Sequence, residues 1–251
     1  MSGQAGALVS LHQTGVQFGA DGRSRAGRSG KGDWALRSVT LAIAAGERVA
    51  LVGATGAGKS TLLRLLHGLL APTEGSVQCQ VGLGQAMLFQ RPHMLRMRVD
   101  SQVALGLWLR GTPWRAARTR AHQVLAQFEL ADLAGRKAHT LSGGQQQRVA
   151  MAQAWALAPQ MLLLDEPTAS LDPHAKAEVE SLLQAFAQAH PQASLVFASH
   201  NLGQVKRLAS RVLYLERGHL LADLPVAQFF DAPTLLAQCP SAHLFVKGEL
   251  A

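Results

Sequence analysis

Cysteine, tyrosine and charged side chains are all scarce in this sequence of 251 residues. The two cysteines, Cys79 and Cys239, are too few for a disulfide framework, and we expect both to be reduced. Charged residues make up 16% of the chain, below the usual ~25%, whereas hydrophobic residues make up 48%. This composition excludes a disordered, collagen-like or coiled-coil chain and favours one large or two small globular domains.

Long hydrophobic runs are also missing. No uninterrupted apolar run approaches the ~18 residues that a membrane-spanning helix needs. The first ten residues, MSGQAGALVS, contain neither the basic segment nor the apolar stretch of a signal peptide. We therefore expect a cytoplasmic protein that does not cross a bilayer by itself.

Acidic residues are outnumbered, because 24 Lys and Arg face 16 Asp and Glu and give a net charge of +8. The excess lies in residues 1–160, and residues 91–120 alone hold seven Arg and a single acid, Asp100. This balance suggests an anionic partner, and the three candidates are nucleic acid, a phosphate ligand and a membrane surface. Stacking aromatics interleaved with basic residues, which nucleic-acid binding favours, are limited here to Trp108 and Trp114.

Strand and helix patterns alternate along most of the chain. Apolar stretches at 8–18, 36–52, 161–164 and 194–198 predict strands, and leucine-rich or amphipathic stretches at 59–70 and 173–190 predict helices. This alternation predicts an α/β fold with a parallel sheet. Residues 91–158 interrupt it with helical spacing only, and the Gly-, Ser- and Arg-rich stretch 21–33 predicts a flexible loop.

The segment GATGAGKST fits the phosphate-binding pattern G-x-x-x-x-G-K-[ST] between an apolar strand and a helix. Its glycines permit a tight turn whose backbone N–H groups face an anion. Its lysine offers a point charge to the β- and γ-phosphates, and its serine offers a hydroxyl to Mg²⁺. We therefore predict that nucleotide is bound by Gly53, Ala54, Thr55, Gly56, Ala57, Gly58, Lys59, Ser60 and Thr61.

Two adjacent acids follow the apolar run MLLL, at the strand end where open α/β sheets bind ligands. Asp165 is suited to hold Mg²⁺, and Glu166 is suited to act as general base on an attacking water.

The segment LSGGQ at 141–145 completes a set of motifs that resembles the ATP-binding cassette (ABC) ATPases over nearly the whole chain. In this resemblance GATGAGKST is the Walker A loop, LSGGQQQR the signature and MLLLDEP the Walker B segment with Glu166 as catalytic base. Gln90 in LFQRP matches the Q-loop glutamine, ASLD at 169–172 the D-loop, and His200 in ASHN the switch histidine.

The resemblance implies a RecA-like P-loop core (1–90 and 159–251) with additional N-terminal antiparallel strands, and a helical subdomain (91–158) that carries the signature. It also implies a head-to-tail pair of cassettes, formed by two copies of this chain, with Mg²⁺ and ATP at each interface. Gln90 would then reach the metal, and Phe18 would stack on adenine in place of the commoner tyrosine. Contacts across the interface are implied for Ser142, Gly143, Gly144, Gln145 and Asp172.

Simpler interpretations exist for two of these motifs. Ser142 and Gln145 have the spacing of a capping box that begins a helix, and Asp172 before a proline is a normal helix N-cap. Capping and nucleotide binding are compatible, because a capped helix N-terminus is itself an anion site.

Within the family, the sequence is most similar to ATPase subunits of bacterial importers for oxyanions such as tungstate, molybdate or phosphate. Such a subunit lies at the inner face of the cell membrane and works with a multi-span permease and an extracytoplasmic substrate-binding protein, without nucleic acid. One departure is MRVDSQV at 97–103, where Arg98 and Gln102 replace the usual Ser or Thr and Asn. The alternative is a soluble ABC ATPase that acts on nucleic acid or the ribosome.

Overall fold

The computed structural model describes residues 6–19, 32–169 and 171–248, and most of the predicted loop 21–33 lies outside them. Its larger sheet has six strands in the order β5-β6-β7-β3-β8-β9. The strands β5 (Gln85–Leu88), β6 (Met161–Asp165), β7 (Ser194–Ala198), β3 (Arg48–Val52) and β8 (Arg211–Glu216) pair in parallel, and β9 (His219–Pro225) joins β8 as an antiparallel edge. The predicted α/β fold with a parallel sheet is confirmed.

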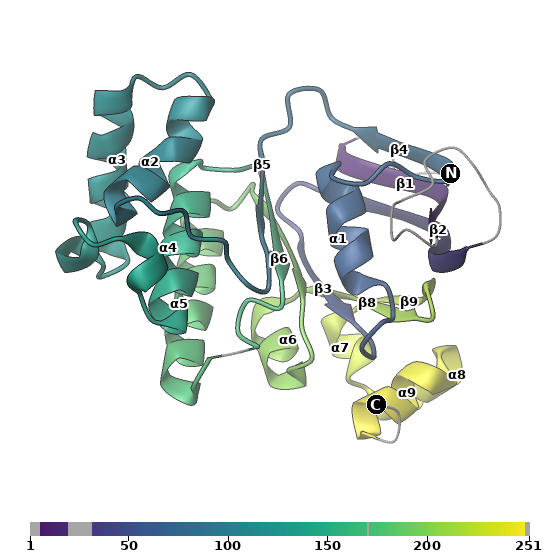
Figure 1. Cartoon of the computed structure of the whole chain (residues 1–251). Coiled ribbons are helices and arrows are strands. Elements are labelled where there is room, and N and C mark those ends of the chain that lie inside the picture. Colours follow the sequence, from purple (N-terminus) through teal and green to yellow (C-terminus); the bar gives the residue numbers. More distant parts are fainter. Residues whose placement is uncertain (1–5, 20–31, 170, 249–251) are drawn as a thin grey trace.

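A second, three-stranded antiparallel sheet is formed by β2 (Asp33–Ala44), β1 (Ala7–Phe18) and β4 (Glu74–Cys79), in that order. It lies beside helix α1 (Lys59–His67) in Figure 1. Strand β2 begins at Asp33, so the last residue of the predicted loop belongs to the sheet. Cys79, at the end of β4, is exposed, whereas Cys239 is buried, and both are free.

The segment between β5 and β6 is helical, as its sequence spacing predicts. It contains α2 (Val99–Leu109), α3 (Trp114–Gln127), the 3₁₀ turns η1 (Ala131–Leu133) and η2 (Ala138–Thr140), and α4 (Gly143–Ala156). Figure 1 shows these helices gathered at one side of the molecule, away from the antiparallel sheet. The connection therefore leaves the core at β5 and returns to it at β6.

The remaining helices follow β6 in the chain. They are α5 (Pro173–Ala189), α6 (Leu202–Leu208), α7 (Val226–Phe229), α8 (Ala232–Gln238) and α9 (Pro240–Lys247). None of the helices in the described ranges is both long and apolar enough to cross a membrane.

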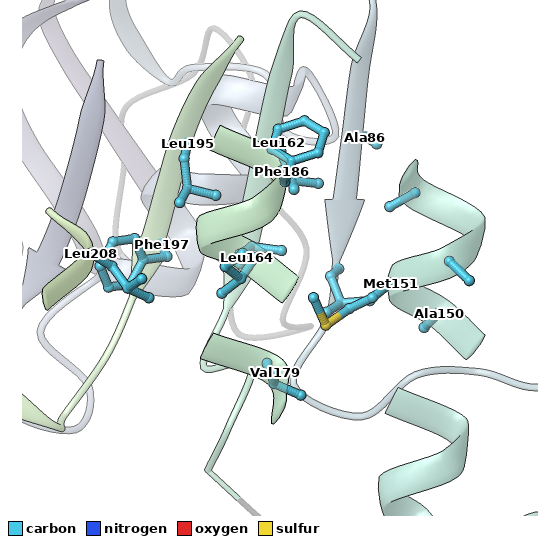
Figure 2. Close-up of a cluster of buried hydrophobic side chains, with 14 of the residues drawn as sticks. Ala86, Ala150, Met151, Leu162, Leu164, Val179, Phe186, Leu195, Phe197 and Leu208 are labelled. Atoms are coloured by element: carbon cyan, nitrogen blue, oxygen red, sulfur yellow. The ribbon is translucent and has the colours of Figure 1, made fainter. Parts of the chain in front are cut away.

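The two faces of the central strands pack into two different hydrophobic clusters. In β6, Leu162 and Leu164 belong to the cluster with α4 and α5, whereas Leu163 belongs to the cluster with α1 and the antiparallel sheet. This division follows the period of two along a strand. Figure 2 shows the first cluster, in which Phe186 of α5 and Met151 of α4 lie near the strand side chains. Burial on both faces explains why this strand reads as a continuous apolar run.

Helix α1 ends earlier than its leucine pattern predicts. We expect it to reach residue 70, but Gly68 adopts a left-handed conformation (φ 82°) and its N–H caps the carbonyls of Arg64 and Leu65. Glycine at this position ends helices because it has no Cβ to oppose positive φ.

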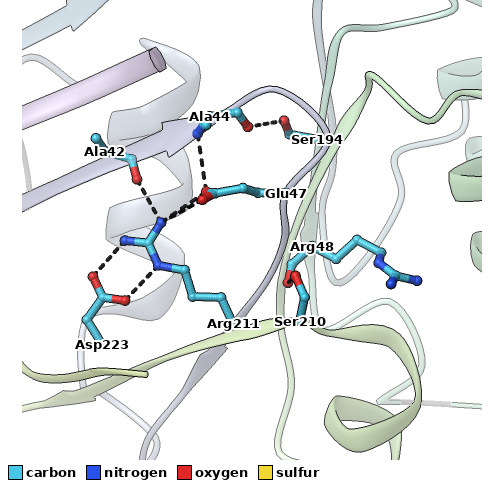
Figure 3. Close-up of polar contacts among 8 residues, drawn as sticks. All are labelled: Ala42, Ala44, Glu47, Arg48, Ser194, Ser210, Arg211 and Asp223. Atoms are coloured by element: carbon cyan, nitrogen blue, oxygen red, sulfur yellow. Dashed lines mark hydrogen bonds and ion pairs between the residues drawn. The ribbon is translucent and has the colours of Figure 1, made fainter. Parts of the chain in front are cut away.

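Polar contacts of Arg211 link the two sheets near the turn between β2 and β3 (Figure 3). Arg211 of β8 donates to both carboxylate oxygens of Asp223 (2.6 Å each) and to Glu47 (3.0 and 3.1 Å). It also donates to the carbonyl of Ala42 in β2 (2.9 Å). Bidentate pairing suits the planar guanidinium, so this single side chain links β8 and β9 to the β2–β3 turn.

Candidate nucleotide-binding site

The phosphate loop connects β3 to α1 in the way that its motif predicts. Gly53, Gly56 and Gly58 all have positive φ (149°, 81° and 106°). A Cβ on Gly53 would lie 2.1 Å from the carbonyl oxygen of Leu215, and one on Gly58 would lie 2.6 Å from that of Ala35. The first and last of these glycines are therefore required by close backbone approach as well as by conformation.

Lys59 is the first residue of α1, and its side chain folds back over the loop. Its Nζ donates to the carbonyls of Gly53 (2.7 Å) and Ala54 (2.9 Å). Burial lowers the pKa of Lys59, and the negative charges of Glu166 and Asp165 oppose this shift. A buried ammonium at the N-terminus of a helix gives this loop the charge and the donors that a polyphosphate requires.

The last residue of β6, Asp165, and the residue after it, Glu166, lie beside this loop. Asp165 is buried and its Oδ1 accepts a hydrogen bond of 2.9 Å from Ser60 Oγ, which joins two segments 105 residues apart. Glu166 has φ 48°, a conformation that is unusual for a residue other than glycine. Its carboxylate lies 2.5 Å from His200 Nε2 and accepts a hydrogen bond of 3.4 Å from Gln90 Nε2.

Together these segments enclose one open cavity of about 280 Å³. Its lining comes from five parts of the chain, and consists of Ala35, Thr55, Gly56, Gly58, Lys59, Ser60, Thr61, Gln90, Glu166 and His200. The structure therefore brings together the predicted phosphate loop, the predicted base, Gln90 and His200.

Other predicted residues lie outside this lining, within the part of the chain that is described. Phe18 is the last residue of β1, is half-buried and packs against the cluster that contains Ala57. Its predicted contact with adenine stays a prediction. Asp172 caps α5 by accepting hydrogen bonds from the N–H groups of His174 and Ala175 (3.0 Å each), as the capping interpretation predicts.

The predicted capping box is present, and α4 begins directly after Ser142 at Gly143. Ser142 Oγ accepts from the N–H of Gln145 (3.3 Å), and Gln145 Oε1 accepts from the N–H of Ser142 (3.1 Å). Gly143 lines a neighbouring cavity that also contains Gln90 and Glu166. A Cβ added at Gly144 would lie 3.9 Å from side-chain atoms of Ala175 and Leu171, which is ordinary van der Waals contact.

Sequence reasoning missed two buried glutamines that form hydrogen bonds with the segments next to His200 and Glu166. Buried Gln204 accepts from Ser199 Oγ (2.7 Å) and donates to Thr168 Oγ1 (3.2 Å). Buried Gln147 of α4 donates to the carbonyl of Pro167 (2.9 Å). No pattern in the sequence distinguishes these residues from surface glutamines, because their partners are brought together only by the fold.

Fold and site together define a P-loop nucleotide-binding domain with an acid, an amide and an imidazole next to the phosphate loop. Residues 36–169 match the ABC transporter family. The chain is 39% identical over 226 residues to the nickel import ATP-binding protein NikO of Rhodobacter capsulatus, covering 82% of this chain and 89% of that one. It is 33% identical over 195 residues to the tungstate uptake system ATP-binding protein TupC of Peptoclostridium acidaminophilum, covering 75% and 91%.

A solved structure of a dimeric ATP-binding cassette in a post-hydrolysis state, bound to ADP and Pi, superposes with a TM-score of 0.74. Its sequence is 26% identical, and the match covers 87% of this chain and 98% of that cassette. The chain belongs to the ABC transporter family and is an ATP-binding, ATP-hydrolysing cassette.

Proposed function

We propose that this cassette is the energising subunit of an importer and works with a separate membrane permease as one of two paired cassettes. The observation that carries this proposal is the convergence of Lys59, Glu166, Gln90 and His200 on one cavity. Similar proteins are named as import or uptake ATP-binding proteins, which supports the transport role. The dimeric cassette among the solved structures supports pairing.

In this proposal, hydrolysis proceeds by attack of water on the γ-phosphorus of ATP. Glu166 takes the proton of the water, the bond between the β–γ bridging oxygen and the γ-phosphorus breaks, and ADP and inorganic phosphate leave. His200 holds the Glu166 carboxylate in place through its contact of 2.5 Å. Lys59 and the phosphate-loop N–H groups stabilise negative charge on the transferring group.

A magnesium ion fits the donor set beside Ser60. A serine hydroxyl and a buried carboxylate 2.9 Å apart, with the Gln90 amide in the same cavity, are the hard oxygen ligands that Mg²⁺ prefers. We therefore assign Ser60, Asp165 and Gln90 to hold Mg²⁺, which when bound would neutralise phosphate charge.

Pairing with a second cassette gives roles to the residues outside the cavity lining. Ser142, Gly143, Gly144 and Gln145 stand at the N-terminus of α4, which is suited to bind the γ-phosphate held by a partner. We assign Asp172 to the same interface and Phe18 to adenine. Residues 91–158 then act as a helical subdomain that moves relative to the core of residues 1–90 and 159–251.

A groove between β5, α2 and α4 is suited to receive the permease. It is lined by His67, Gln85, Phe89, Met94, Gln102 and Leu157, among others. Gln102 bridges it, accepting from the N–H of Leu95 (3.0 Å) and donating to Gln153 (3.1 Å). Its lining residues Phe89 and Pro92 lie on either side of Gln90 in the chain, so a permease segment seated there is linked directly to the nucleotide cavity.

For the transported substrate we propose an oxyanion such as tungstate, delivered by an extracytoplasmic substrate-binding protein. Similar proteins are named for tungstate and phosphate, and also for nickel, sulfonates and methionine. The test is uptake of tungstate and of nickel by cells that lack this gene and express either the parental protein or Glu166→Gln. Tungstate uptake restored only by the parental protein supports the proposal, and restoration of nickel uptake alone overturns the oxyanion assignment.

A membrane surface is one of the anionic partners that the charge balance suggests, and we propose that the basic residues within 91–120 face it. Arg98 and Arg118 both pair with Asp100 (3.0 and 2.6 Å), so part of the positive charge in residues 91–120 is neutralised within the fold. Arg115 and Arg120 remain on α3, near an exposed pair of indole rings, Trp108 and Trp114, with centroids 6.2 Å apart. Residues 101–128 contain no acid.

We expect the double variant Arg115→Gln/Arg120→Gln to bind vesicles of mixed phosphatidylserine and phosphatidylcholine roughly 30-fold more weakly, since each basic residue contributes about 1 kcal/mol near an anionic surface. Sedimentation with vesicles at low salt measures this. The control is Arg64→Gln/Lys247→Gln, which removes two exposed charges elsewhere. Equal binding of both double variants would contradict a membrane-facing role for α3.

A further inference from the structure

Asp100, in the first turn of α2, is a buried carboxylate that the mechanism above does not use. Its side chain has no exposed surface and is surrounded by cationic groups from two elements. Arg98 lies 3.0 Å away, Arg118 of α3 2.6 Å, and the imidazole of His122 3.6 Å. Burial alone would raise the pKa of Asp100, but hydrogen bonds from Arg118 and Ser101 and the two guanidinium charges lower it.

The same residue lies where two distant segments pair. Its N–H donates to the carbonyl of Ala134 (3.0 Å), and the N–H of Val99 donates to that of Arg136 (2.9 Å). Arg98 forms an isolated antiparallel bridge with Lys137, and the N–H of Ala138 donates to the carbonyl of Met97 (2.8 Å). Residues 97–100 and 134–138 therefore form one hydrogen-bonded unit, which we call the Asp100 bridge.

The Asp100 bridge stands between the proposed permease groove and the proposed partner-facing serine. On one side, residues 90–96 lead to it from Gln90, and Met94 lines the groove. On the other side, η2 (Ala138–Thr140) begins within the bridge and ends two residues before Ser142. Gln146 of α4 donates to the carbonyl of Leu141 (3.0 Å), so the short segment after η2 is tied to α4.

We infer that Asp100 is a positioning residue that holds the segment after Gln90 and the segment before Ser142 as one unit, so that a displacement at the groove is carried to the serine. This inference rests on the proposed pairing of Ser142 with the nucleotide of a second cassette. Among the described residues, the backbone contacts between the segment that carries Arg98 and residues 134–138 are the three hydrogen bonds and the bridge given above.

Charge is what makes this unit rigid. The Asp100 carboxylate is fully buried, and its charge-assisted hydrogen bonds hold at one point the guanidinium groups of Arg98 and Arg118, which are 55% and 40% exposed. Asn at position 100 would keep the shape and two polar atoms but leave Arg98 and Arg118 without a counter-charge. The Walker A loop and Glu166 have no contact with Asp100 among the interactions described, so they remain intact.

The test compares Asp100→Asn with Glu180→Gln, both in the Glu166→Gln background. Glu180 is a buried carboxylate paired bidentately with Arg207 (2.8 and 2.9 Å) between α5 and α6, so its loss removes the same chemistry from a different place. We expect Asp100→Asn to weaken ATP-dependent dimerisation at least tenfold in analytical ultracentrifugation. ATP affinity of the monomer should change less than twofold, and Glu180→Gln should change neither quantity.

In the hydrolysis-competent background, Asp100→Asn should lower kcat with little change in KM, because loop binding of nucleotide is preserved. If Asp100→Asn does not fold, Arg98→Gln removes one partner, which is 55% exposed, and tests the same unit. Equal dimerisation of Asp100→Asn and Glu180→Gln overturns the inference. A separate variant, Ser142→Ala, tests the proposed pairing: normal dimerisation of that variant would overturn the role of Ser142, whatever Asp100 does.

Discussion

Glu166→Gln is expected to lower the rate of ATP hydrolysis by about 100- to 10,000-fold, the range that a positioned general base contributes. The amide has nearly the shape of the carboxylate, so its oxygen still reaches His200 and Gln90, which now lie 2.5 and 3.4 Å from the acid. It accepts no proton from water at neutral pH. Removing the negative charge also removes its repulsion of the γ-phosphate, so ATP and the paired state should accumulate together.

Single-turnover hydrolysis and size-exclusion chromatography with ATP measure the two expected effects. Glu180→Gln is the matched control, because it makes the same change at a buried carboxylate outside the nucleotide cavity. His200→Ala should also slow hydrolysis, because Glu166 then loses its nearest polar partner. Hydrolysis by Glu166→Gln at the parental rate would mean that another group, or water alone, accepts the proton.

The phosphate loop could be predicted from sequence because its requirements are local. Gly53 and Gly58 are needed by the backbone, and Lys59 and Ser60 lie within seven residues of the first glycine. A buried strand followed by two acids is equally local, since both features belong to one run of residues. Such short patterns keep their meaning whatever the rest of the chain does.

The environment of Asp100 could not be predicted, because the sequence shows only one acid among seven arginines. That pattern favours a solvated basic surface, and two of the arginines instead neutralise a buried carboxylate. Arg98 is only two residues away, but Arg118 is 18 residues away and reaches Asp100 only because α3 packs against α2. Buried Gln204 and Gln147 were missed for the same reason: a polar residue reveals its burial only through partners supplied by the fold.

Lys59→Met is expected to weaken ATP binding roughly a hundredfold. In this structure the ammonium donates to the carbonyls of Gly53 and Ala54, and its residue is only 6% exposed. The attraction between a unit charge and a nearby phosphate is about 4 kcal/mol at an effective dielectric constant of 20. Part of this gain is offset, because the ammonium gives up its hydrogen bonds to the loop carbonyls when it binds phosphate. A net loss of about 3 kcal/mol corresponds to the hundredfold change. Methionine keeps the length of the side chain, so the buried volume changes little.

The measurement is the rise in unfolding temperature on addition of ATP, since a ligand that binds only the folded state stabilises it by an amount that grows with the logarithm of its affinity. The parental protein should show a large rise that decreases with salt, and Lys59→Met a much smaller rise that depends less on salt, because one cation–phosphate contact is gone. The control is Lys206→Met, which removes a lysine that stacks on Phe230 with its Nζ 4.5 Å from the ring centre. That variant should respond to ATP like the parental protein. An equal rise for Lys59→Met and the parental protein would contradict the assignment of Lys59 to nucleotide binding. The buried ammonium would then only stabilise the loop through its hydrogen bonds to the carbonyls of Gly53 and Ala54.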